Sequence, residues 1–261
     1  MGVPPGKGTR GRAIILAAGV GSRVTPHADA APTCLVDLGG KTLLCRYLEA
    51  FAALGIPEAV LVVGYRREQV VAEAAAGPPA VRVRVVENDR YTRGHILSLW
   101  QARHEFDDDV LIMDADLLFP QELLARLLAT PYPTAIAVDE QFQDAGEEKK
   151  VACEDGWVIE VSKKISHDAR VRGAAVGVLR LSTEAAEILR GILEEFIETG
   201  KDSLEYQEAF RELAGEVPIG VVEMGDLPWV AIESQENLAR AQNEILPRVD
   251  RLDRGETVPA P

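Results

Sequence analysis

Cysteine, long apolar runs and positive charge are all scarce in this sequence, and each shortage argues against a class of protein. The three cysteines among the 261 residues, Cys34, Cys45 and Cys153, lie far apart, which argues against a disulfide framework and against a zinc site. No stretch is apolar over the roughly 18 residues that a membrane-spanning helix needs. We therefore expect a protein without structural disulfides that does not cross a membrane.

Basic residues are outnumbered by acidic ones, 28 against 42, and the formal net charge is −14. Nucleic-acid partners are therefore not expected, because binding to a phosphate backbone needs a basic face. A nucleotide site in such a chain has to be locally positive, so the few Arg and Lys residues inside motifs become informative.

The length and the start of the chain indicate one cytoplasmic domain. A chain of 261 residues with 47% hydrophobic residues can bury a sizeable core. The first residues, MGVPPGKGTRGR, are basic and glycine-rich, and the apolar run behind them is too short for a signal peptide. The sequence thus predicts a single domain over residues 1–247 and a frayed tail over residues 248–261.

The most informative stretch is a glycine loop inside residues 13–26, AIILAAGVGSRVTP. A short apolar run that ends at glycines is typical of a buried parallel strand, and the glycines let backbone N–H groups approach an anion closely. Arg23 follows Gly21 by two residues and adds a guanidinium that can grip phosphate oxygens. We therefore expect this loop to bind phosphate.

Two other glycine motifs are excluded at this loop. The dinucleotide-binding pattern G-x-G-x-x-G would need a glycine where Val24 stands. Residues 40–42, Gly-Lys-Thr, resemble the end of a Walker A loop, but the leading glycine of that motif would fall on Leu35. The pattern that remains is Gly-x-Gly-x-Arg.

Downstream of the loop, short apolar runs alternate with segments of helical periodicity. This alternation predicts a mostly parallel sheet with helices on both faces, which is an α/β fold. Short strands broken by a polar turn are expected over residues 151–181. The other predicted strands are 59–63, 81–87, 109–113, 134–138, 219–223 and 230–232, and the predicted helices are 42–54, 64–76, 94–104, 120–128, 183–198, 203–213 and 234–243.

Asp114 and Asp116 follow the predicted strand 109–113. Ligands of α/β sheets gather at the carboxyl ends of strands, and both the glycine loop and these two aspartates fall at such ends. Carboxylates two residues apart project to one face wherever the chain is still extended, and such oxygen ligands hold Mg²⁺ together with substrate phosphates. The sequence therefore predicts a magnesium site at this edge of the sheet.

The segment LAAGVGSRVTP, followed by PTCL at 32–35 and LGGK at 38–41, resembles the signature of the nucleotidyltransferases. These enzymes join a nucleoside triphosphate to a phosphorylated small molecule, and their pattern reads roughly L-A-A-G-x-G-[ST]-R-[LM]-x-P, then P-K-x-L. The resemblance implies the Rossmann-like sheet of the nucleotide-diphospho-sugar transferase type. One departure is Thr33, which stands where the family has a lysine that helps to hold the triphosphate.

The same resemblance implies roles for two acidic residues. Asp116 corresponds to the family's metal-binding aspartate, and Glu233, in WVAIES, stands where a second metal aspartate is usual. Asp226, three residues before Trp229, is a less favoured substitute for Glu233. The residues assigned to nucleotide binding are Leu16, Ala17, Ala18, Gly19, Gly21, Ser22, Arg23, Asn88, Ser98 and Asp114.

Three later segments partly resemble the phosphocholine and phosphonate cytidylyltransferases. Asn88 and Ser98, in NDRYTRGHILSLW, agree with the pattern of that subfamily, whereas Gly-His at 94–95 replaces a pair of asparagines. The segments EEKKV and IEVSKKI imply that Lys150 and Lys163 face the phosphate of the acceptor and act in catalysis with Arg23. Ala174 replaces a glutamate of the subfamily, which indicates an acceptor different from the commonest one.

We interpret the chain as a Mg²⁺-dependent nucleotidyltransferase, with CTP as the favoured nucleotide and a small phosphate or phosphonate as the acceptor. A sugar- or cyclitol-1-phosphate nucleotidyltransferase is one alternative. A nucleotide-binding regulatory protein, with catalysis weakened by Thr33 and Glu233, is another. Aromatic residues make up only 5% of the chain, so an aromatic cage for phosphocholine is not favoured. The sequence leaves the oligomeric state open, and a homodimer is compatible with it.

Overall fold

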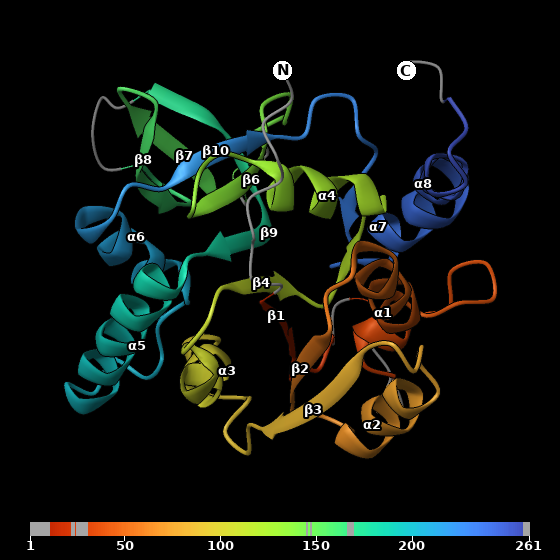
Figure 1. The fold of residues 1–261 in the computed structure, drawn as a ribbon, viewed down its shortest axis with the longest axis horizontal. Coiled ribbons are helices and arrows are strands. Elements are labelled where there is room, and N and C mark those ends of the chain that lie inside the picture. Colours follow the sequence, from red (N-terminus) through yellow and green to blue (C-terminus); the bar gives the residue numbers. More distant parts are fainter. Residues whose placement is uncertain are drawn as a thin grey trace.

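The computed structural model describes residues 11–21, 24, 31–144, 146, 148–165 and 170–257. They form a nine-stranded sheet in the order β10-β6-β9-β4-β1-β2-β3, with the β7-β8 hairpin attached to β9, and a separate two-stranded sheet of β5 and β11 (Figure 1). The strands are β1 Arg12–Ala17, β2 Glu58–Val63, β3 Arg82–Glu87, β4 Val110–Asp114, β5 Leu117–Leu118, β6 Ala135–Asp139, β7 Lys150–Glu154, β8 Trp157–Ser162, β9 Arg170–Leu181, β10 Gly220–Glu223 and β11 Val230–Ala231. The α-helices are α1 Leu43–Leu54, α2 Arg67–Ala75, α3 Ile96–Gln101, α4 Gln121–Ala129, α5 Thr183–Glu198, α6 Gln207–Glu216, α7 Gln235–Arg240 and α8 Leu246–Asp253.

The central strands run in parallel and carry helices on both faces. β1 pairs in parallel with β2 and β4, and β2 pairs in parallel with β3. Ile15 of β1 packs into the hydrophobic cluster beneath α1, α2 and α4, whereas Ile14 packs into the cluster beneath α3, α5 and α6. Figure 1 shows α3 and α5 on one side of the sheet and α1 and α2 on the other. The predicted α/β fold is therefore confirmed.

Local signals in the sequence account for the bounds of α1. The Thr42 side chain accepts a hydrogen bond from the backbone N–H of Cys45 at 3.0 Å, which caps the first turn. Gly55 ends the helix with a φ of 71°, a left-handed conformation that glycine adopts without a steric penalty. The helix predicted from Leu43, Tyr47 and Phe51 at helical spacing is therefore present.

The C-terminal segment differs from its prediction. The sequence predicts a frayed tail from residue 248, but α8 continues to Asp253 and buries Val249 at 1% exposure. Pro247 stands in the first turn of α8, which directly follows the π-helical turn Ala241–Ile245. The apolar side of this short helix therefore covers part of the core. None of the helices in the described part of the chain combines the length and hydrophobicity needed to cross a membrane.

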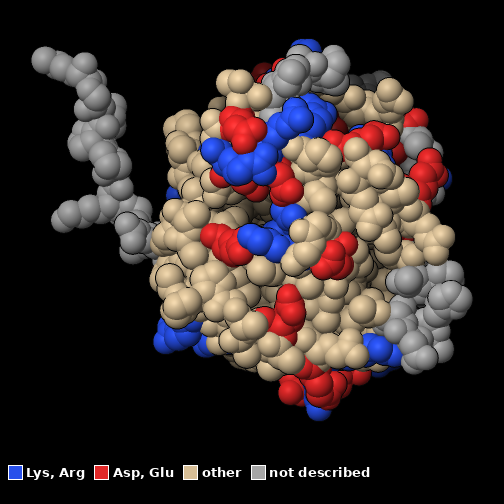
Figure 2. Space-filling view, turned by 90° about the vertical axis from the view of Figure 1, so that its right-hand side faces the viewer, with Lys and Arg blue, Asp and Glu red and all other residues tan. Residues whose placement is uncertain are grey.

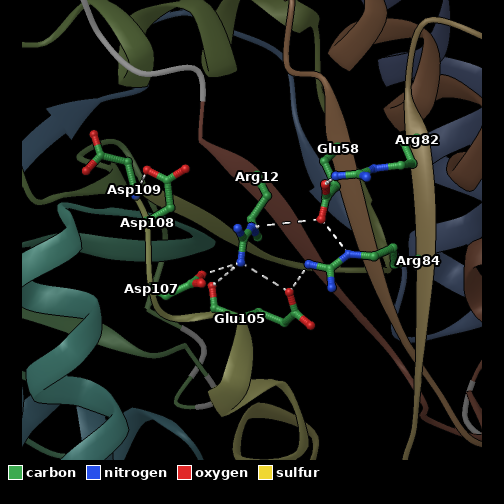
Figure 3. Close-up of polar contacts among 8 residues, drawn as sticks. All are labelled: Arg12, Glu58, Arg82, Arg84, Glu105, Asp107, Asp108 and Asp109. Atoms are coloured by element: carbon green, nitrogen blue, oxygen red, sulfur yellow. Dashed lines mark hydrogen bonds and ion pairs between the residues drawn. The ribbon is translucent and has the colours of Figure 1, made fainter.

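An ion-pair network lies at the amino ends of β1, β2 and β3 (Figure 3). Glu58, only 7% exposed, binds Arg82 and Arg84, and Glu105, 8% exposed, binds Arg12 and Arg84. Burial raises the pKa of Glu58, but the hydrogen bonds from Arg82 and Arg84 outweigh burial, so the pKa lies below the ordinary value of 4.5. On the face shown in Figure 2, basic and acidic side chains also lie next to one another.

Replacing Glu58 with glutamine is expected to lower the free energy of unfolding by about 2 kcal/mol, because clustered arginines lose a buried charged partner. The pKa of Glu58 is lowered in the folded state, so its contribution is present above the ordinary pKa and is lost as the pH falls through the folded value. Urea unfolding near neutral pH measures the loss in the variant, and urea unfolding at about pH 3.5 measures how far the contribution of Glu58 declines in acid. Glu68→Gln, which removes an exposed partner of Arg67, should cost under about 0.5 kcal/mol. Equal losses in the two variants would contradict the prediction.

Candidate active site

The carboxyl ends of β1 and β4 lie side by side and carry the central part of the candidate site. Leu16 of β1 pairs with Asp114 of β4, so the glycine loop after β1 and the Asp114–Asp116 segment leave the sheet at the same edge. A cavity of about 350 Å³, called the loop cavity here, opens at this edge. The loop residues Leu16, Ala17, Gly19 and Gly21 line it, together with Ser98.

The other residues assigned to the nucleotide lie around this cavity or beyond the described chain. Asn88 is fully buried and lines no part of the cavity, but its Nδ2 donates to the Ser98 Oγ at 3.0 Å. Ala18 is 1% exposed and its carbonyl oxygen accepts a hydrogen bond from the N–H of Tyr65 at 3.1 Å. Ser22 and Arg23 lie outside the described residues, so their roles stay predictions.

Thr33 packs directly against the glycine loop. Gly21 has a φ of 62°, and a Cβ built on it would stand 2.3 Å from the Thr33 Oγ1. Only glycine therefore fits at position 21 while Thr33 keeps this place. Thr33 and Cys34 both line the loop cavity, so the position of the missing family lysine does face the candidate phosphate site.

A second cavity of about 540 Å³, called the β9 cavity here, lies on the other side of the aspartates. Trp229 lines it and donates from Nε1 to the Asp139 Oδ2 at 2.9 Å. The other two tryptophans are elsewhere: Trp100 stacks beneath Arg103 and Trp157 contacts Tyr132. The three tryptophans therefore do not form a common aromatic cage.

The two cavities share a wall. Glu233 reaches this wall because β11 pairs with β5 and the N–H of Ile232 donates to the Asp116 carbonyl oxygen at 2.8 Å. Residues that are far apart in the sequence are thereby held next to each other. The residues that line both cavities are Asp114, Asp116, Lys149, Tyr206 and Glu233.

The carboxylates of the shared wall repel one another. Burial, followed by the negative charges of Asp114 and Glu233, raises the pKa of Asp116 to about 7. Burial also raises the pKa of Asp114, while the nearby Lys149 and the hydrogen bond donated by the Tyr206 hydroxyl at 2.6 Å act in the opposite direction. At neutral pH the site therefore holds unfavourable negative charge that a cation would relieve.

This donor set fits a magnesium ion. No group of three or more His, Cys, Asp or Glu side chains within the described ranges has a metal-binding arrangement. Mg²⁺ needs fewer protein ligands, because one or two carboxylates hold it while water and substrate phosphates complete its shell. Asp116 and Glu233 would be the two protein ligands.

Ion binding is expected to weaken as the pH falls below about 7. Folding raises the pKa of Asp116 from 3.8 to about 7, so between these values the folded state binds a proton that the unfolded chain lacks. Without a divalent ion, stability should therefore rise as the pH falls from about 8 to about 6. The increase in Tm caused by Mg²⁺ should shrink over the same interval, because the ion competes with the proton. Thermal unfolding in Mg²⁺ and in EDTA tests this, and a Mg²⁺-induced increase that does not change with pH would contradict it.

The structure separates the candidate lysines. Lys150 begins β7, and its Nζ stands 2.6 Å from the Asp144 Oδ2. Neither Lys150 nor Lys163 lines either cavity, whereas Lys149 lines both. Tyr206 lies just before α6 and belongs to no recognisable sequence motif. Its contact with Asp114 follows only from the tertiary fold.

His95 is a further residue of the loop cavity. Its Nδ1 lies 2.9 Å from the Glu205 Oε2. The hydrogen bond with Glu205 raises the pKa of His95, although burial opposes this effect. The predicted helix 94–104 places His95 near a helix start, as α3 does, but no sequence pattern predicts its contact with Glu205.

The sequence is similar to a family of nucleotidyltransferase domains. A sequence model of the family described as "MobA-like NTP transferase domain" matches residues 13–196. The CMP-5'-(3-aminopropyl)phosphonate synthase of Streptomyces rubellomurinus is 35% identical over 127 residues, which are 48% of this chain and 20% of that protein. The bifunctional IPC transferase and DIPP synthase of Rubrobacter xylanophilus is 30% identical over 251 residues, which are 93% of this chain and 54% of that protein. The chain thus spans about half or less of the length of these relatives.

Solved structures show the same fold. The inositol-1-phosphate CTP transferase from T. maritima superposes with a TM-score of 0.73 at 18% identity, over 95% of this chain and 98% of that one. The CTP:phosphocholine cytidylyltransferase from Streptococcus pneumoniae has a TM-score of 0.67 at 20% identity, over 88% of this chain and 97% of that one. The sheet and its helices are therefore of the Rossmann-like type found in these proteins.

Proposed function

Because the chain belongs to the family of MobA-like NTP transferase domains, we propose that it is a cytidylyltransferase for a small phosphate or phosphonate acceptor. Its homologues are nucleotidyltransferases, and several of their names describe transfer from CTP or formation of a CMP product. Those names support CTP as the nucleotide and an anionic acceptor.

The observation that carries this proposal is the shared wall between the two cavities. If a nucleoside triphosphate occupied the loop cavity and an acceptor the β9 cavity, the phosphate of one and the phosphate or phosphonate of the other would meet at Asp114, Asp116 and Glu233. Transfer between two bound substrates needs such a junction, because correct positioning of the reacting groups supplies much of the rate. The volumes of about 350 and 540 Å³ suit two small ligands.

The reaction follows from this arrangement. An oxygen of the acceptor attacks the α-phosphorus of CTP, a new P–O bond forms, and the bond to the β-phosphate breaks as pyrophosphate leaves with the electron pair. The attacking oxygen is already ionised, so no proton-transfer residue is required. Backbone N–H groups at Gly19 and Gly21 would hold the phosphates, and Arg23 would neutralise part of their charge. Mg²⁺ held by Asp116 and Glu233 would neutralise charge on the phosphate oxygens.

Pyrophosphate release tests the proposal. The protein is incubated with Mg²⁺ and each of CTP, UTP, GTP, ATP and dTTP, crossed with 2-aminoethylphosphonate, phosphocholine, inositol 1-phosphate and glucose 1-phosphate. We expect turnover with CTP and one of the first two acceptors. Turnover only with a sugar or inositol phosphate would favour the alternative of a sugar- or cyclitol-1-phosphate nucleotidyltransferase, which the name of the structure from T. maritima also supports. Binding of CTP, seen as a thermal shift, without any turnover would favour a regulatory protein.

A further inference from the structure

We propose that Lys149 is a catalytic residue at the junction of the two cavities, where its ammonium group contacts both the α-phosphate of the nucleotide and the phosphate or phosphonate of the acceptor. This inference rests on the proposed nucleotidyl transfer and names the side chain whose positive charge contacts the reacting groups. It differs from the sequence-based assignment, which places Lys150 and Lys163 at the acceptor.

The composition of the shared wall is the first observation. Three of its members are carboxylates and one is a phenol, so Lys149 is the one basic residue among the described residues that line both cavities. Two phosphorus groups that meet there bring further negative charge. A metal ion on Asp116 and Glu233 would neutralise the negative charge of these two carboxylates. Lys149 lies where it can neutralise the charge of the substrate phosphates that the ion does not contact.

The second observation is that the fold holds Lys149 in place. Its carbonyl oxygen accepts a hydrogen bond of 2.7 Å from the N–H of Ala175 on β9. Its Nζ lies 5.2 Å from the centre of the Tyr206 ring, a distance at which the ring attracts a cation. Tyr206 is itself held by the hydrogen bond from its hydroxyl to Asp114. Both ends of the lysine are therefore anchored beside the carboxylates.

The third observation is the contrast with the next residue. Side chains of neighbouring residues in an extended segment point to opposite sides. Lys150 accordingly turns away from both cavities and pairs with Asp144 at 2.6 Å. The two adjacent lysines thus differ in access to the junction and in the ion pair with Asp144, and Lys150→Met distinguishes this assignment from the sequence-based one.

The chemistry gives Lys149 a defined task. As the acceptor oxygen bonds to the α-phosphorus and the bond to pyrophosphate breaks, negative charge is spread over the equatorial oxygens of the transferred group. An ammonium group at the junction donates hydrogen bonds to these oxygens and to the acceptor. Loss of one donor that acts on developing charge typically lowers the rate by about 100- to 1,000-fold.

The kinetic test compares Lys149→Met, Lys149→Arg and Lys150→Met with the unaltered protein, using the best substrate pair from the pyrophosphate assay. Methionine keeps much of the length of lysine but removes the charge. We expect Lys149→Met to lower kcat by about 100-fold or more. It should also lower kcat/KM for both substrates. Lys149→Arg should recover part of the loss, and Lys150→Met should stay within about threefold of the unaltered protein. Activity of Lys149→Met within threefold, or a larger loss in Lys150→Met, would overturn the inference.

A binding measurement separates this inference from the proposed function. Calorimetric titrations with CTP and with 2-aminoethylphosphonate need no turnover. Lys149→Met should weaken both ligands about tenfold, because a charge-assisted contact is lost on each side of the junction, whereas Lys150→Met should weaken neither. If the unaltered protein binds both ligands but releases no pyrophosphate with any pair, nucleotidyl transfer fails while Lys149 is still tested. Unchanged affinity of Lys149→Met for both ligands would overturn the inference whatever the outcome of the assay. A Tm close to that of the unaltered protein excludes misfolding as the cause.

Discussion

Asp116→Asn is expected to reduce kcat for nucleotidyl transfer on the order of 1,000-fold, since it removes a carboxylate on which both the metal ion and the reacting phosphates would depend. The same variant should be more stable than the unaltered protein in EDTA at about pH 8. The reason is that the pKa of Asp116, about 7, reflects burial and repulsion from Asp114 and Glu233, and asparagine relieves both. A gain in stability together with a loss of activity is a signature that simple misfolding cannot produce.

Steady-state kinetics and thermal unfolding in EDTA measure the two effects. Asp226→Asn is the matched control, because it makes the same chemical change at an exposed residue whose Oδ1 accepts a hydrogen bond from Gln141. Asp226 is also the less favoured alternative for the second metal ligand, so its variant should keep activity within about twofold. A large loss in Asp226→Asn with normal activity in Asp116→Asn would place the ion elsewhere.

Gly177→Ala is expected to damage both the fold and the site. Gly177 lies on β9 with a φ of 89°, and a Cβ there would stand 2.6 Å from the Asp114 Oδ2 and 3.3 Å from the Leu117 Cδ1. An alanine would therefore be strained in its backbone and would push the Asp114 carboxylate away from Tyr206. We expect a loss of about 2–4 kcal/mol in the free energy of unfolding and a fall in kcat of about 100-fold.

Urea unfolding and kinetics at saturating substrate concentrations test this prediction. Gly191→Ala is the control, since Gly191 lies inside α5 and a Cβ there has no neighbour within 4 Å. That change should raise the free energy of unfolding by up to about 1 kcal/mol and leave kcat unaltered. If Gly177→Ala keeps both the stability and the activity of the unaltered protein, the contact of residue 177 with Asp114 does not hold the site together.

Parts of the site that depend on neighbours in the sequence could be predicted from the sequence. The apolar run and the glycines after it place a loop at the end of β1, and the apolar run before Asp114 places the aspartates at the end of β4. Parallel strands bring their carboxyl ends to one edge, so the meeting of these two segments follows from the alternation of strands and helices.

Other parts depend on contacts between segments that are distant in the sequence. The resemblance of WVAIES to the family pattern predicts that Glu233 works beside Asp116, but the physical cause of their approach is the pairing of β11 with β5, which local periodicity does not specify. The contact of Tyr206 with Asp114 joins residues 92 positions apart. The separation of the three tryptophans likewise follows from packing, because each ring binds a different partner.

The sequence alone determined the α/β class and the positions of the glycine loop and of the candidate metal aspartates, because strand periodicity, glycine conformation and carboxylate chemistry are local properties. The tertiary structure alone decided which lysine faces the junction, since Lys149 and Lys150 have the same chemistry and differ only in orientation. It also decided that the two cavities share one wall. Such a wall exists only when β4, β11 and the turn before α6 have packed together, and hydrophobic burial along the whole chain drives that packing.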